Sequence, residues 1–226
     1  MKNILFFFIF IIFTTSANGH IADYLNLKKI YMEIFKDGKN IGFCEYKFIQ
    51  KDSFLEVQNI TKFNVDLLGL KIFTIDSHGT EVYKNNKLIS FKSETYQNKK
   101  KKFVNLNFKK KTNNFFIEGS SFVGFASLNN VVGNWWNHDL LKTDSQISPL
   151  SGSVKKQVVS FIQKEKIKLY GKEYNTHKFK LKSLDVNLPK DKKLDFDIWI
   201  NPKNNLILKV SYNRMGTWEY RLKTFN

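Results

Sequence analysis

Apolar and polar residues alternate with a period of two along most of the chain beyond its N-terminal segment. The first alternating segment is followed by Lys36-Asp37-Gly38-Lys39-Asn40, in which Asp-Gly readily adopts the positive φ angles of a tight turn. Because successive side chains of a strand point to opposite faces, this pattern predicts a β-hairpin. Its apolar face carries Ile30, Met32, Ile34, Cys44, Tyr46 and Phe48.

The same alternation predicts strands at Phe54 to Asp66, Leu70 to Asp76, Thr80 to Tyr83, Leu88 to Tyr96 and Phe103 to Lys109. Towards the C-terminus it predicts a turn at Tyr170-Gly171-Lys172 and strands at Asp195 to Ile200, Leu206 to Tyr212 and Thr217 to Thr224. Antiparallel strands with one apolar face must bury that face by curling into a barrel or by forming a sandwich. A barrel also removes exposed edges. We therefore predict an all-β fold, an antiparallel meander that forms a closed or half-open barrel.

The alternation stops between about residues 119 and 152, a stretch that contains Trp135-Trp136-Asn137-His138-Asp139-Leu140-Leu141 and Pro149. We interpret this stretch as an irregular strap between two β halves, with a short helix around Asn137 to Lys142. We read Gly119-Ser120-Ser121-Phe122-Val123-Gly124 at its start as a loop, because its spacing differs from that of a nucleophile elbow. Long irregular inserts are often functional lids or binding loops. A plug that closes one end of the core is the alternative, and the pattern leaves both open.

The first residues have the pattern of a secretory signal peptide: Lys2, an apolar run from Ile4 to Phe13, and small residues up to Gly19. We expect cleavage after Gly19, with a cut after Ala17 as the alternative. This gives a signal peptide at 1–19 and a single β domain at 20–226. Ten apolar residues are too short to span a hydrocarbon core of ~30 Å, so we expect the processed chain not to be transmembrane. The predicted location is the periplasm.

Cys44 is the single cysteine of the chain, so no internal disulfide can form. It also lies far beyond the expected cleavage site, so it cannot carry the lipid of a lipoprotein. A thiol nucleophile paired with His138 and Asp139 is conceivable, but the flanking sequence does not support it, and a cysteine on an apolar face is typical of a core. The histidines lack close metal-ligand spacing. We therefore predict no catalytic residue, metal site or cofactor, and favour a non-enzymatic protein.

The formal net charge of +17 comes almost entirely from lysine, since the only arginines are Arg214 and Arg221. Nucleic-acid readers favour arginine, and export would separate the chain from nucleic acid, so we expect no nucleic-acid partner. A lysine surface could instead contact anionic envelope components such as membrane head groups or acidic glycans. The abundance of Lys, Asn, Ile and Phe is also what an AT-rich genome produces without any partner. The candidate contact residues form one run: Lys99, Lys100, Lys101 and Lys102.

Several short motifs together resemble an uncharacterised family of exported bacterial proteins, the domain of unknown function six-one-three-four. They are Gly38-Lys39-Asn40-Ile41-Gly42, Trp135-Trp136-Asn137 with Leu140-Leu141, Asp197-x-Trp199, and Gly216-Thr217-Trp218-Glu219-Tyr220-Arg221-Leu222. The resemblance spans most of the chain beyond the signal peptide. It implies an all-β periplasmic domain with a distant likeness to half-barrels that carry lipoproteins or lipids. The family brings no established activity and no catalytic residues.

Two functional hypotheses follow. In the first, an apolar or amphiphilic ligand such as a lipid or acyl chain binds in the barrel interior, where aromatic side chains are abundant. The residues expected to line or gate that site are Trp135, Trp136, Leu140, Trp199 and Trp218. In the second, the protein is a non-enzymatic interaction or scaffold module of the cell envelope that uses its lysine-rich surface.

Overall fold

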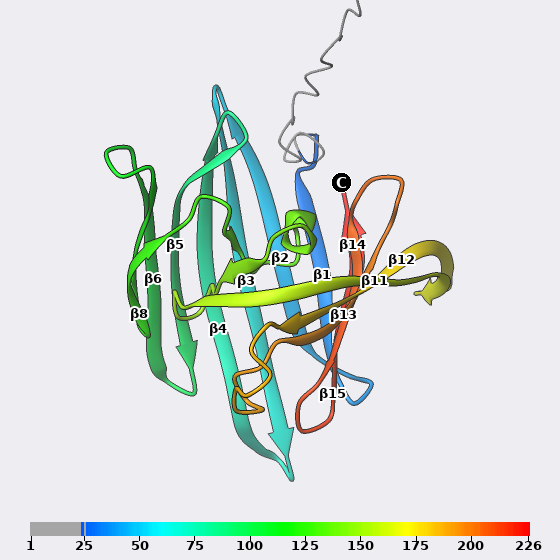
Figure 1. Ribbon diagram of the computed structural model, residues 1–226. Helices are drawn as coiled ribbons and strands as arrows, with labels where there is room; N and C mark the ends of the chain where they lie inside the picture. The colour runs from blue at the N-terminus through cyan, green and yellow to red at the C-terminus, as the bar shows by residue number, and fades with distance from the viewer. Residues whose placement is uncertain (1–23, 25) are drawn as a thin grey trace, which may run out of the picture.

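The computed structural model describes Tyr24 and residues 26–226, so the predicted signal peptide lies outside the described residues. The described strands form one 15-stranded sheet that curls around a single concave face (Figure 1). Its order is β8-β7-β6-β5-β4-β3-β2-β1-β15-β14-β13-β12-β11-β10-β9, so the ends of the sheet, β8 and β9, are not paired with each other. The predicted all-β meander is confirmed, in its half-open form.

The first half of the sheet contains β1 (Lys29–Lys36), β2 (Lys39–Lys51), β3 (Phe54–Leu67), β4 (Leu70–Lys84), β5 (Lys87–Gln97), β6 (Lys100–Lys109), β7 (Asn114–Gly119) and β8 (Phe122–Ala126). The second half contains β9 (Val131–Val132), β10 (Ser145–Ile147), β11 (Val154–Leu169), β12 (Lys172–Ser183), β13 (Asp195–Ile200), β14 (Ile207–Asn213) and β15 (Thr217–Phe225). The two halves join where β1 pairs with β15. Neighbouring strands are antiparallel except for β9 and β10.

The strap contains the 3-10 helix η2 (His138–Leu141), which confirms the predicted short helix. The Asn137 side chain caps this helix by accepting a hydrogen bond from the Asp139 amide at 2.9 Å. The expectation of a loop at residues 119–124 was wrong in part. Gly119 ends β7 and Phe122 begins β8, so this segment is a hairpin with a turn at Ser120 and Ser121.

Two strands differ from the sequence prediction. We expected separate strands on either side of Ser77-His78-Gly79, but β4 runs through all three residues. Inside the sheet, the Ser77 hydroxyl is hydrogen-bonded to that of Thr95 at 2.6 Å, so a polar residue is satisfied where an apolar one would be expected. Strand β7 was not predicted, although its residues alternate between buried and partly exposed positions.

The core lies on the concave face in two clusters of buried residues. The larger one joins β1–β4 to β12–β15 and includes Met32, Cys44 and Leu222. The smaller one lies between β5–β7 and the strap and includes Phe91, Leu106 and Ile147. Among the described residues, no helix is long and apolar enough to span a bilayer.

A substitution at Gly42 tests how closely β2 and β3 approach. A Cβ atom at this position would lie 2.1 Å from the Lys62 carbonyl oxygen and 2.5 Å from the Phe63 Cβ atom. We predict that Gly42→Ala lowers the free energy of unfolding by about 2 to 3 kcal/mol, because the backbone of β3 must move. Urea unfolding measures this loss.

Gly79→Ala is the matched control on β4. Its Cβ would approach a side chain, the Phe91 ring, at 3.2 Å, and a ring can turn aside more easily than a backbone. A loss for Gly42→Ala no larger than that for Gly79→Ala would contradict the prediction.

Candidate functional site

The strap is fastened to the concave face by the buried side chain of Glu81 on β4. Its Oε1 atom accepts hydrogen bonds from Asn134 Nδ2 at 2.6 Å and from Trp136 Nε1 at 2.8 Å, both in the strap. Its Oε2 atom accepts the hydroxyl of Tyr83, the next inward residue of β4. Burial raises the pKa of the Glu81 carboxyl above its ordinary value of 4.5, although these three hydrogen bonds act in the opposite direction.

A second set of contacts holds the helix of the strap. The Tyr24 hydroxyl lies 2.6 Å from His138 Nδ1, and His138 Nε2 lies 3.0 Å from the Lys142 ammonium group. The Trp135 amide donates a hydrogen bond of 3.0 Å to the hydroxyl of Tyr46 on β2. Both ends of the Trp135-Trp136 pair are therefore tied to the sheet by polar contacts.

A continuous series of aromatic rings runs from the strap along the concave face to the β3–β4 hairpin. We call it the aromatic row: Trp135, Phe196, Tyr212, Trp218, Phe63 and Phe73. Successive ring centroids lie 5.1, 5.3, 5.8, 5.5 and 5.8 Å apart. Trp218 and Phe63 are buried, and the other four members are partly exposed. Burial raises the pKa of Tyr212 to about 12, as expected for a phenol in apolar surroundings.

Polar side chains occupy the neighbouring part of the same face, on β2 to β5. This polar row contains Cys44, Asn59, Thr61, Ser77 and Thr95. The Cys44 sulfur accepts hydrogen bonds from Asn59 Nδ2 at 3.2 Å and from Thr61 Oγ1 at 3.1 Å. Burial raises the pKa of the Cys44 thiol, so the thiol form is favoured. The concave face thus carries an aromatic part and a polar part side by side.

The structure places the five predicted ligand residues at different sites. Trp135 and Trp218 belong to the aromatic row, whereas Trp136 and Leu140 are completely buried beneath the strap. Trp199 lies on the opposite face of the sheet, where its Nε1 atom donates to Glu165 Oε1 at 2.6 Å. Lysine ammonium groups of Lys178 and Lys209 lie 4.7 and 5.0 Å from its ring centroid. A ligand-binding role for these five residues stays a prediction.

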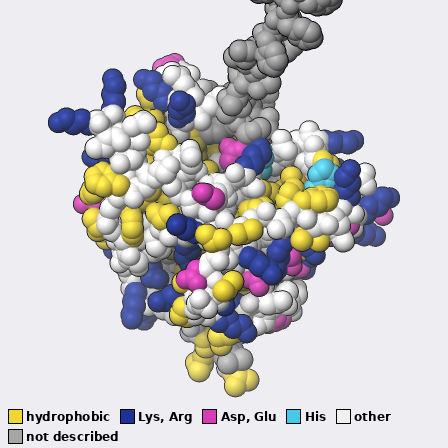
Figure 2. Space-filling view, viewed as in Figure 1, with side chains coloured by type: hydrophobic (Ala, Val, Ile, Leu, Met, Phe, Trp, Pro, Cys, Tyr) yellow, Lys and Arg dark blue, Asp and Glu magenta, His cyan; other side chains and the backbone are white. Residues whose placement is uncertain are grey.

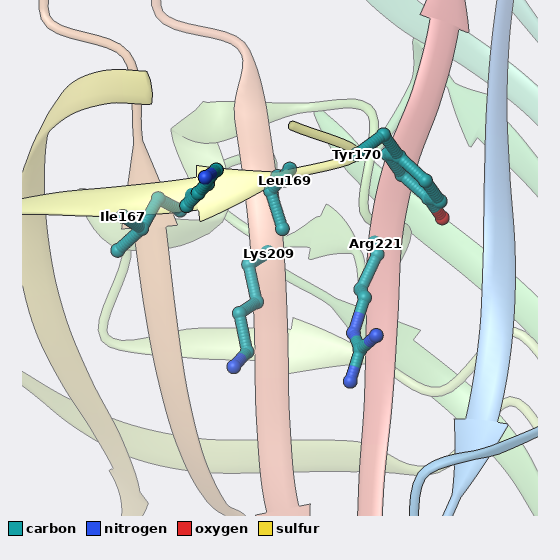
Figure 3. A pocket seen from close by; sticks show the side chains of 6 residues that line it. Ile167, Leu169, Tyr170, Lys209 and Arg221 are labelled. Atoms are coloured by element: carbon teal, nitrogen blue, oxygen red, sulfur yellow. The ribbon is translucent and has the colours of Figure 1, made fainter. Parts of the chain in front are cut away.

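A hollow of about 310 Å³ lies near Trp199 on this outer face, beneath the β11–β12 turn (Figure 3). Ile167, Leu169 and Tyr170 border it on one side, and the side chains of Lys209 and Arg221 lie opposite them. Both cations form ion pairs with the single carboxylate of Glu219, so the three groups together keep one positive charge. Lys168 also lines the hollow, so the charged side chains at its border are positive in sum.

The predicted lysine run lies at the β5–β6 turn. Lys99 and Lys100 are exposed, Lys101 forms an ion pair with Glu94 at 2.5 Å, and Lys102 donates to Gln97 Oε1 at 2.6 Å. Its role as an anionic contact stays a prediction. Four members of the aromatic row were missed by the sequence reasoning, namely Phe63, Phe73, Phe196 and Tyr212. Phe196 and Tyr212 lie within the strands predicted at Asp195 to Ile200 and Leu206 to Tyr212, but no local signal shows that their rings meet.

The histidines do not gather around Cys44. His78 is exposed beside Asp76, at 3.1 Å, and the His177 ring packs against Phe161 with a centroid distance of 5.8 Å. His138 is held by Tyr24 and Lys142, as described above. Among Tyr24 and residues 26–226, no group of three or more His, Cys, Asp or Glu side chains has metal-binding geometry.

We predict that Glu81→Gln changes how stability depends on pH. Because the folded chain raises the pKa of Glu81, its contribution to folding is largest in acid and declines as the pH rises above 4.5. Glutamine has nearly the same shape and does not titrate. The stability of the variant relative to the native protein should therefore improve between about pH 5 and about pH 8 in urea unfolding. An unchanged difference between the two proteins would contradict this.

Glu81→Ala is the companion variant. It leaves the donors of Asn134, Trp136 and Tyr83 without their acceptor, and each buried unsatisfied donor costs about 1 to 3 kcal/mol. We expect a loss of at least about 3 kcal/mol in unfolding free energy at neutral pH.

Comparison with known proteins shows similarity to uncharacterised families. No curated protein matches the chain. The crystal structure of a β-barrel-like protein from Brucella abortus, of the domain of unknown function DUF1849, has a TM-score of 0.60 at 9% identity and covers 88% of this chain and 97% of its own. A Bacteroides fragilis protein with a YmcC-like fold covers 88% and 94%, with a TM-score of 0.36 and 11% identity. The model of the domain of unknown function DUF6134 matches residues 32–223, and the chain therefore belongs to that family.

Proposed function

We propose that the protein is a non-enzymatic, exported protein of the periplasm that binds an amphiphilic molecule with an acyl chain on its concave face. The observation that carries this proposal is the aromatic row from Trp135 to Phe73, which lies beside a row of polar side chains. An amphiphile needs both surfaces, one for its chain and one for its polar group.

The aromatic row suits an acyl chain because three successive members, Trp135, Phe196 and Tyr212, are partly exposed and in ring-to-ring contact. Phe196 and Tyr212 lie at its centre with a centroid distance of 5.3 Å, and neither is fully covered by protein. Apolar surface of this kind gains about 25 cal/mol for each Å² that a ligand removes from water. The row is long as well as continuous, which favours an extended ligand over a compact one.

The polar row suits the polar group. Asn59 and Thr61 are partly exposed, and both already donate to the Cys44 sulfur, a weak acceptor. A carboxylate or ester oxygen is a stronger acceptor and could take over these donors. Tyr220 connects the two rows, because its ring lies 6.0 Å from that of Trp135 and its neighbours include the Cys44 thiol.

The strap contributes only one of its three predicted ligand residues to the proposed binding surface. Trp136 and Leu140 have no exposed surface, so a ligand could reach them only if the strap moved. Trp135 differs, because its ring is partly exposed and packs against Phe196 at 5.1 Å. We therefore assign Trp135 to the binding surface and Trp136 and Leu140 to the fastening of the strap.

Native mass spectrometry of the processed chain, purified gently after export, tests the proposal. We expect extra mass that organic extraction releases, and binding of oleate to the extracted protein with quenching or enhancement of tryptophan fluorescence. The double variant Phe196→Ser/Tyr212→Ser should weaken oleate binding by about tenfold or more, because it removes two aromatic surfaces from the centre of the row.

The matched control is Phe116→Ser/Phe125→Ser. These rings also form a pair with a centroid distance of 5.3 Å, but they lie on the outer face of β7 and β8. Oleate binding should be unchanged in this control. A bare chain mass together with no oleate binding, or equal losses in both double variants, would overturn the proposal.

A further inference from the structure

Four hairpin turns lie together at one end of the sheet, the lower end in Figure 1. They join β1 to β2, β3 to β4, β5 to β6, and β14 to β15. We call this the hairpin end. The β3–β4 turn reaches furthest and forms the lowest point of the molecule, where Figure 2 shows apolar side chains.

The β3–β4 hairpin extends beyond its neighbours as a two-stranded arm. Pairing of β2 with β3 ends at Phe63, and pairing of β4 with β5 ends at Ile75. Beyond these residues, 64–67 pair with 70–74 of the same hairpin, and Thr74 at the base of the arm also exchanges hydrogen bonds with Asn98 of the β5–β6 turn. An isolated two-stranded hairpin is marginally stable in water. An arm of this kind is therefore suited to contact with another surface.

The tips at this end carry the most exposed large apolar side chains described. Leu68 in the β3–β4 turn is 95% exposed, and Met215 in the β14–β15 turn is 92% exposed. In the arm, Leu70 and Ile72 are 71% and 49% exposed. Leu68 and Met215 therefore bury almost none of their apolar surface in the fold of this chain.

Leu68 and Met215 occupy turn positions whose backbone conformation is unfavourable for aliphatic residues. Both have positive φ angles, of 50° and 49°, and each precedes a glycine. At the same end, the equivalent turn positions are held by Asp37, with φ of 50°, and Asn98, with φ of 48°. Asn and Asp are the side chains that tolerate this conformation best, and aliphatic ones are disfavoured. Folding alone would favour Asn at all these positions, so the apolar residues require another explanation.

Positive charge surrounds the apolar tips. The exposed cations of the four hairpins include Lys39, Lys71, Lys99, Lys100 and Arg214. Within the four turns and the two positions on either side of each, the acidic residues are Asp37 and Asp66, and Asp37 is already bonded to Lys36 at 2.6 Å and to the Thr217 amide at 2.7 Å. The hairpin end is therefore basic at its rim and apolar at its points.

We propose that the hairpin end docks on an anionic phospholipid bilayer, with Leu68 and Met215 inserted among the acyl chains and the lysines on the lipid phosphates. Apolar tips ringed by lysine match the layered chemistry of such a surface, in which head groups lie above hydrocarbon. A docked protein partner would bury the same tips, and the experiment distinguishes the two. The inference does not depend on the ligand site, since its residues lie in the turns.

Cosedimentation with vesicles tests the inference. The probe is the processed chain, its N-terminus verified by mass spectrometry, with vesicles of two parts phosphatidylcholine to one part phosphatidylglycerol. We expect binding that weakens between about 0.1 M and about 1 M salt and is lost on pure phosphatidylcholine. Leu68→Asn/Met215→Asn should weaken binding by about tenfold or more, with a thermal midpoint equal to or above that of the native protein.

Matched controls test whether the loss of binding depends on where the substituted residues lie, and not only on their type. Lys99→Gln/Lys100→Gln should weaken binding by about fivefold per lysine, whereas Lys110→Gln/Lys111→Gln, at the far end of β6, should not. Val123→Asn removes a valine that is 69% exposed at the middle level of the sheet and should also have no effect. Phe196→Ser/Tyr212→Ser should bind vesicles normally, which keeps this result separate from the ligand test.

A direct readout of insertion completes the experiment. Cys44 is buried, so Leu68→Cys provides a single reactive thiol for a nitrobenzoxadiazole label. Its fluorescence should rise with anionic vesicles, and that of labelled Val123→Cys should not. Failure of the native protein to bind anionic vesicles, binding unchanged in Leu68→Asn/Met215→Asn, or no rise for the Leu68 label would each overturn the proposal.

Discussion

The hydrogen bonds to the carboxylate of Glu81 couple the strap to the sheet, and the rest of the architecture depends on that coupling. A single curled sheet has one apolar face and no second sheet to cover it. A buried carboxylate is costly unless donors surround it. Two of its donors, Asn134 and Trp136, belong to the strap, and the third, Tyr83, belongs to the sheet. The burial of Glu81 is therefore fully compensated only when the strap is in place. The position of the strap and the stability of β4 depend on each other for this reason.

Much of the fold could be predicted because the alternation of side chains is a local signal. In the strand predicted at Thr217 to Thr224, alternation places Trp218, Tyr220 and Leu222 on one face, and all three contribute to the core on the concave face. The signal failed where the interior is polar. Ser77 breaks the apolar pattern of β4, yet it continues the strand because Thr95 on β5 satisfies its hydroxyl at 2.6 Å. That partner comes from another strand, so the sequence of β4 alone could not reveal it.

The candidate site was less predictable than the fold, for a physical reason. Trp199 and Trp218 are alike as residues, but Trp199 alternates with Ile198 and Ile200 and so faces away from the core. The alternation of side chains along β13 is enough to predict that Trp199 faces outward. Trp199 was predicted as a ligand residue because tryptophan is a large aromatic residue, and its place in the alternation was not considered. The meeting of Phe63 with Trp218 is different. This contact depends on the pairing of β1 with β15, the first and last strands. The register of that pairing cannot be predicted from any short segment of the sequence.

The aromatic row and the hairpin end meet in the β3–β4 arm, and this gives the two proposals a common physical basis. Phe73, the last ring of the row, lies in the arm whose turn carries Leu68. An arm held among acyl chains would place the end of the aromatic row at the bilayer surface. An acyl chain leaving the lipid would meet Phe73 first, and the other partly exposed rings, Tyr212, Phe196 and Trp135, lie beyond the buried Phe63 and Trp218. The cost of exposing an acyl chain to water, about 0.8 kcal/mol for each methylene group, is what such an arrangement would avoid.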